Sequence, residues 1–75
     1  MLIQVKTLTG RKINLNLQND NIIRDIKMEL MEKEGIDVSQ IRLICKGKQL
    51  NDTMRIDSEL NSGDIIHMVL SLRGG

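Results

Sequence analysis

Two side chains in this sequence could form a nucleophile and its base, namely the single cysteine, Cys45, and the single histidine, His67. A cysteine nucleophile needs a nearby base to form its thiolate. In the strands predicted below, Cys45 shares parity with inward Leu43, whereas His67 shares parity with outward Val69. The two side chains should therefore project from opposite faces of a sheet. One cysteine and one histidine also cannot complete a zinc site. The sequence predicts a protein that is not an enzyme and has no metal site and no cofactor.

The other group that could do chemistry is the carboxylate of the final residue, Gly75, which follows Gly74. Two residues without Cβ atoms make a narrow tether that can enter a tunnel too small for other residues. In an arbitrary domain, such an end is more often a frayed terminus or an expression scar. The two glycines alone do not distinguish a functional tether from a frayed or artificial end, so the other residues of the chain have to be considered.

Alternation of apolar and polar residues predicts two strands at the start of the chain. Residues 1–6 and 12–18 alternate with period two, and the inward positions are Met1, Ile3, Val5, Ile13, Leu15 and Leu17. Gly10 lies in the turn between them and can supply a positive φ. The two strands should form a β-hairpin.

An amphipathic helix is predicted next, over residues 22–34, because apolar residues recur at helical spacing at Ile23, Ile26 and Leu30. The polar residues 19–21 could cap its start, and Gly35 could supply a left-handed C-cap.

The second half of the sequence predicts residues 41–45 as a strand, residues 49–50 as a paired stub and residues 65–72 as a final strand. Residues 51–64 follow neither period and should form a loop with one helical turn. The order β-β-α-β-β predicts an α+β fold, with a mixed sheet packed on one helix. All 75 residues are assigned to one domain.

The composition excludes several classes of protein. The net charge is +1, and the chain contains no aromatic residue and no run of like charge, so neither nucleic acid nor a membrane is expected as a partner. A lone cysteine cannot form an internal disulfide, and the first residues lack a long apolar stretch. We therefore expect an intracellular protein. We also expect it to be a monomer and to occur in the cytoplasm and the nucleus.

The chain resembles ubiquitin and its relative, the neddylation modifier. The residues that carry the resemblance are MLI at 1–3, VKTLTG at 5–10, KEGI at 33–36, RLI at 42–44, GKQL at 47–50 and LRGG at 72–75. It spans the whole chain and implies a ubiquitin-like β-grasp domain over residues 1–75 with a conjugation tail from about residue 71. It also implies that the terminal glycine is activated with ATP, carried as a thioester and joined to a target lysine by an isopeptide bond. The implied partners are activating and conjugating enzymes, ligases, deconjugating proteases and cullin-type substrates, and the catalytic residues belong to those enzymes.

The outward strand positions Ile44, His67 and Val69, together with Leu8 on the hairpin loop, predict a protein-binding patch. Its basic rim would be Lys6, Arg42 and Lys48. Scattered surface hydrophobes are the ordinary alternative, but three such positions on one sheet face favour a site. The resemblance implies a second patch from Ile36, Leu70 and Leu72.

Several positions depart from the family pattern. Asp37-Val38 replaces a pair of prolines, Cys45 replaces an aromatic residue and Ser58 stands where a tyrosine normally anchors the loop. The 52–63 loop is one residue shorter than in the family, so it must close differently. Lys48 is the candidate lysine for chain linkage, whereas Arg11, Glu29 and Ser62 replace other linkage lysines.

The residue just before Leu72 and Arg73 indicates the branch of the family. The activating enzyme is expected to recognise this residue together with Leu72 and Arg73. Ubiquitin has an arginine there and the neddylation modifier a small alanine, and Ser71 is small and neutral. This favours neddylation, with attachment to cullins. The alternatives are a divergent ubiquitin paralogue and a ubiquitin-like binding module that is never conjugated.

Overall fold

The predicted hairpin forms from β1 (Leu2–Lys6) and β2 (Lys12–Asn16), which pair antiparallel. The computed structural model describes residues 1–71. Five of the six predicted inward side chains of the hairpin are buried as the alternation predicts, Met1 is half-buried, and Gly10 has a positive φ of 85°. Strand β2 ends before the predicted limit at residue 18, but Leu17 stays buried and donates its N–H to the Met1 carbonyl oxygen at 2.8 Å.

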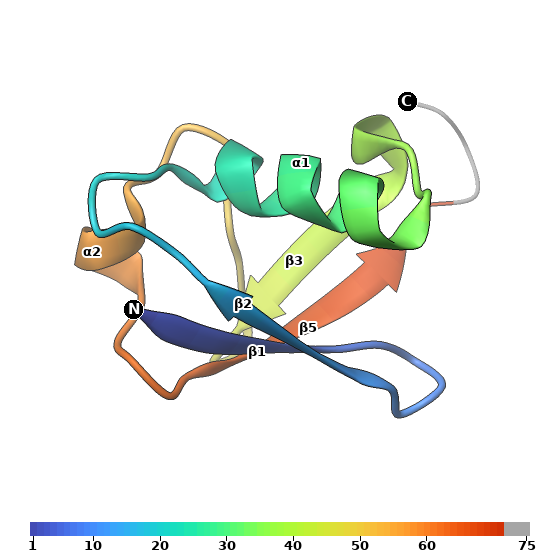
Figure 1. Ribbon diagram of the computed structural model, residues 1–75, viewed down its shortest axis with the longest axis horizontal. Helices are drawn as coiled ribbons and strands as arrows, with labels where there is room; N and C mark the ends of the chain where they lie inside the picture. The colour runs from blue at the N-terminus through green and yellow to red at the C-terminus, as the bar shows by residue number, and fades with distance from the viewer. Residues whose placement is uncertain (72–75) are drawn as a thin grey trace.

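Helix α1 (Ile23–Glu34) crosses one face of the sheet, as Figure 1 shows. Its inward residues Ile23, Ile26 and Leu30 are each 0% exposed, which confirms the helical spacing. Gly35 ends the helix with φ 70° and donates its N–H to the Met31 carbonyl oxygen at 2.9 Å, which confirms the predicted C-cap.

The predicted cap at the start of α1 is wrong. Asn21 Oδ1 accepts a hydrogen bond from the Gln18 N–H at 3.0 Å, so it closes the preceding turn instead of capping the helix. The Ile23 N–H donates to the Met54 carbonyl oxygen at 2.9 Å. The free N–H groups of the helix are thus satisfied partly by a loop far away in sequence, which local patterns do not reveal.

Three strands and two short helices follow α1, and the strands complete one five-stranded sheet. In chain order these elements are η1 (Val38–Gln40), β3 (Ile41–Cys45), β4 (Lys48–Gln49), α2 (Ile56–Glu59) and β5 (Ile65–Leu70). The strand order is β2-β1-β5-β3-β4, in which β1 and β5 are parallel and the other neighbours antiparallel. A mixed sheet with one long helix across it confirms the predicted α+β class.

Aliphatic and sulfur-containing side chains fill the core between α1 and the sheet, and no polar or charged residue within 1–71 is fully buried. The 51–64 segment contains the expected helical turn, α2, and buries Ile56 and Leu60. Ser58 Oγ donates to the Arg55 carbonyl oxygen at 3.0 Å, so the residue that replaces the family tyrosine makes only a local bond. The Ile56 N–H donates to the Asn21 carbonyl oxygen at 2.9 Å, which ties the short loop to the start of α1.

Candidate functional site

The sheet face opposite α1 carries most of the predicted binding patch. Ile44 on β3 lies opposite His67 on β5, and Arg42 lies opposite Val69 in the same ladder. Lys6 on β1 lies beside His67 in the parallel pair. The buried neighbours of these residues, such as Leu43 and Met68, point to the core, so all five predicted residues share the outer face.

This outer face combines apolar and basic groups. Ile44, Val69 and Lys6 are half-buried, whereas His67 and Arg42 are exposed. Apolar side chains that remain half in water beside cations can bury further area in a complex and gain polar contacts at its edge. The arrangement is suited to binding another protein.

Leu8 lies apart from the strand ladder, in the turn between β1 and β2, and is 79% exposed. It lines a cavity of about 210 Å³ together with Ile36, Met68 and Leu70. The Arg11 guanidinium pairs with Glu34 at 2.9 Å among the lining residues. The structure therefore brings Leu8 together with the two described residues of the predicted second patch, a grouping that strand parity alone did not show.

Lys48 also differs from the other two predicted rim residues. It lies opposite Cys45 in the β3–β4 pair, so it has the parity of the core side, and its Nζ is 3.1 Å from Glu59 Oε1 on α2. Its side chain is nevertheless 59% exposed. Lys48 is thus accessible to another molecule, but from the edge of the sheet next to α2.

The structure separates the nucleophile from the base that sequence analysis considered. Cys45 is buried, and this burial raises the pKa of its thiol, while His67 is exposed on the opposite face. Within residues 1–71 there is no group of three or more His, Cys, Asp or Glu side chains that could hold a metal ion. Across the same residues, no helix has the length and apolar character needed to cross a bilayer.

The predicted conjugation tail begins at about residue 71, which is the last residue that the structure describes. The Ser71 N–H donates to the Gln40 carbonyl oxygen at 2.7 Å, which fixes the chain beside η1 just after β5. The other tail residues named from the sequence, Leu72, Arg73, Gly74 and Gly75, lie outside the described residues.

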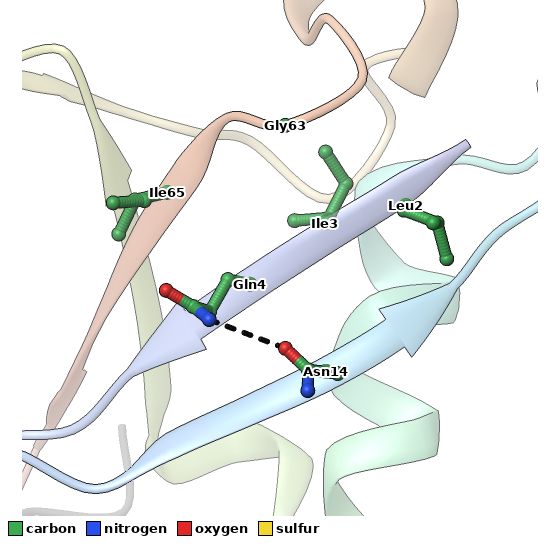
Figure 2. Close-up of a pocket in the computed structure, with 6 residues that line it drawn as sticks. All are labelled: Leu2, Ile3, Gln4, Asn14, Gly63 and Ile65. Atoms are coloured by element: carbon green, nitrogen blue, oxygen red, sulfur yellow. Dashed lines mark hydrogen bonds between the residues drawn. The ribbon is translucent and has the colours of Figure 1, made fainter.

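A hollow that was not expected from the sequence lies at the other end of the outer face. It has a volume of about 460 Å³, and Figure 2 shows Leu2 and Ile65 beside the amide side chains of Gln4 and Asn14. Gln4 Nε2 donates to Asn14 Oδ1 at 3.3 Å between β1 and β2. Leu2 is 62% and Ile65 45% exposed. The signal was present, because both are apolar residues at outward strand positions.

Comparisons with known proteins agree with this fold. The ubiquitin family model matches residues 3–73. The chain is 47% identical over 76 positions to the NEDD8-like protein RUB1 of Saccharomyces cerevisiae, covering 100% of this chain and 99% of that protein. It is 49% identical to the ubiquitin-like protein 1 of Schizosaccharomyces pombe and 46% identical to the ubiquitin-like protein NEDD8 of Dictyostelium discoideum, again over 100% of this chain and over 97% and 99% of those proteins.

The β-grasp arrangement, the family match along nearly the whole chain and the full-length relatives lead to one assignment. The chain belongs to the ubiquitin family and is a ubiquitin-like protein modifier, not an enzyme.

Proposed function

We propose that this modifier acts through the carboxylate of Gly75. An activating enzyme joins that carboxylate to AMP from ATP and releases pyrophosphate. An enzyme cysteine then displaces AMP to form a thioester, and the ε-amine of a target lysine displaces the thiol to form an isopeptide bond. The observation that carries the proposal is the similarity to the RUB1 and NEDD8 relatives over 100% of this chain, which includes both terminal glycines.

We further propose that the chain belongs to the neddylation branch and that cullin lysines are its targets. Two of the compared relatives carry NEDD8 in their names. Ser71 is the second support, because a small neutral residue avoids repulsion by a basic gatekeeper and lacks the arginine that acidic groups of a ubiquitin-activating enzyme would attract.

The outer face formed by Lys6, Arg42, Ile44, His67 and Val69 is the proposed surface for receptors, conjugating enzymes, ligases and deconjugating proteases. Ile44 should act as its central anchor, so the Ile44→Ala variant should bind such receptors about 1–3 kcal/mol more weakly. For chain formation we favour Lys48, whose side chain is 59% exposed, over Lys27, whose side chain is 11% exposed. The proposed setting is a monomer in the cytoplasm and nucleus.

A charging assay tests the proposal. The full chain is incubated with ATP and, in separate reactions, with the neddylation-activating and the ubiquitin-activating enzyme, and adducts are resolved with and without a thiol reductant. We expect a reductant-sensitive adduct with the neddylation enzyme, lost when Gly75 is deleted. The Ser71→Arg variant should shift charging toward the ubiquitin enzyme.

Each part of the proposal has its own contrary result. If the ubiquitin-activating enzyme charged the chain preferentially, the assignment to the neddylation branch would be wrong and the chain would be a ubiquitin paralogue. Absence of an adduct with either enzyme, from a chain that is folded by circular dichroism, would leave the unconjugated binding module as the better interpretation.

A further inference from the structure

A polar cavity of about 410 Å³ lies where the start of α1 meets η1, β3 and β4. Five of its lining residues are charged, with three cations and two anions, namely Arg24, Lys27, Arg42, Asp37 and Asp52. We call this cavity the arginine pocket. Conjugation of a modifier does not by itself require such a cluster of charges. We therefore asked which of the five charged groups already have a partner within the chain.

Both carboxylates of the arginine pocket are already satisfied within the chain. Lys27 Nζ lies 2.5 Å from Asp52 Oδ1, and the lysine side chain is only 11% exposed. Asp37 Oδ1 accepts hydrogen bonds from the N–H and the hydroxyl of Ser39, each at 2.9 Å, and these bonds lower the pKa of the Asp37 carboxyl. Among the residues that the structure describes, neither carboxylate is paired with an arginine.

The two arginines of the pocket stand in contrast to the others. Arg11 pairs with Glu34 at 2.9 Å and Arg55 with Asp57 at 2.8 Å. Within residues 1–71, the guanidinium groups of Arg24 and Arg42 have no hydrogen-bond or ion-pair partner. Each presents five fixed donors suited to a planar anion.

The position of Arg24 also opposes helix stability. It is the second residue of α1, where the aligned peptide dipoles leave partial positive charge and favour an acidic side chain. Asp25 in the same turn follows that preference and accepts a hydrogen bond from the Ile22 N–H at 2.9 Å. A cation at this place that has no internal partner is more readily explained by binding to something outside the chain.

We propose that the arginine pocket binds an acidic segment of a partner protein, with an aspartate or glutamate carboxylate held by Arg24 and Arg42. Three cations and two anions leave one net positive charge in the cavity, which a single carboxylate balances. A phosphate carries about −1.5 to −2 charges, which exceeds the single net positive charge of the cavity. The Gln49 side-chain amide in the lining can donate a further hydrogen bond. This surface shares Arg42 with the outer face but adds Arg24, Lys27 and Gln49, which the outer face does not include, and it does not depend on conjugation of Gly75.

The binding test uses the full chain labelled with ¹⁵N and three probes. These are a blocked peptide of alternating glutamate and glycine, the same peptide with glutamine for glutamate, and inorganic phosphate. We expect saturable shifts with the glutamate peptide at the amides of Val38 and Ser39 and at the side chains of Arg24, Arg42 and Gln49, which weaken as salt rises. The neutral peptide and phosphate should bind at least about tenfold more weakly. Tighter binding of phosphate, or shifts located elsewhere, would overturn the proposal.

Two matched variants separate the pocket from general surface charge. Arg24→Gln should weaken binding of the glutamate peptide about fivefold or more, whereas Arg55→Gln, which removes an exposed arginine already paired with Asp57, should change it less than about twofold. Arg24→Lys should restore only part of the affinity because lysine lacks the bidentate fork. The Arg24→Gln variant should melt no lower than the parent because it removes a cation from the first turn. Equal effects of the two glutamine variants would refute a role for the arginine pocket.

Discussion

Adjacent residues of β3 should respond very differently to the same substitution. Leu43 is 0% exposed and points to the core, while Ile44 is half-buried on the outer face. Leu43→Ala removes three carbon groups, worth about 0.8 kcal/mol each, and leaves a cavity, for a total loss of about 2–5 kcal/mol. A domain of 75 residues has a free energy of unfolding of about 4–11 kcal/mol, so this single change removes a large part of it.

For Ile44→Ala the same arithmetic gives about 2 kcal/mol or less, because part of the side chain is already in contact with solvent and no enclosed cavity forms. Urea unfolding followed by circular dichroism measures both losses, and thermal unfolding should show a difference of about 4–8 °C for each kcal/mol that separates them. If Ile44→Ala lost as much stability as Leu43→Ala, the outward placement of Ile44, and with it the proposed binding surface, would be wrong.

Three further outcomes follow from charges and burial. Hydrogen bonding from the Asn61 N–H lowers the pKa of Asp64, so its ionised form stabilises the native state above the unfolded pKa of about 3.9, and that contribution disappears as the pH falls through the lower folded value. The Asp64→Asn variant should therefore lose less of its free energy of unfolding in urea between about pH 5 and about pH 2 than the parent does. Burial raises the pKa of the Cys45 thiol, so a thiol reagent should label the native protein far more slowly than the urea-unfolded chain, and equal rates would contradict its placement. Lys27→Ala removes both the ion pair with Asp52 and the packing of a side chain that is only 11% exposed, and should cost about 1–3 kcal/mol in urea unfolding. Lys27→Met also removes the ion pair but keeps the packing volume and should cost less; the reverse order would contradict the burial of the Lys27 side chain.

The sequence was most informative where a periodic pattern coincides with burial on one side. The hairpin, α1 and β3 could be predicted because each has one apolar face and one polar face, which fixes which side chains meet the core. The same parity correctly separated Cys45 from His67. These features depend only on local spacing.

Features that depend on contacts between distant segments could not be predicted. The capping of α1 by the loop that holds Met54, the ion pair of Lys48 with Glu59 and the grouping of Leu8 with Leu70 each require the fold itself. The arginine pocket could not be predicted either, because Arg24 and Arg42 lie on different elements. The sequence also does not show which carboxylates in the pocket already have partners.

The parallel pairing of β1 with β5 determines when this protein can finish folding. Gln4 lies beside Ile65, and β5 in turn separates β1 from β3 in the sheet. During synthesis the hairpin and α1 can form early, but the middle of the sheet stays open until β5 has been made, because this contact joins the two ends of the domain. The strand that closes the sheet is also the one that leads directly into Ser71 and the tail. Since Ser71 follows β5 directly and is bonded to Gln40 just before β3, the segment that leads to the tail is held in place only after the sheet has closed.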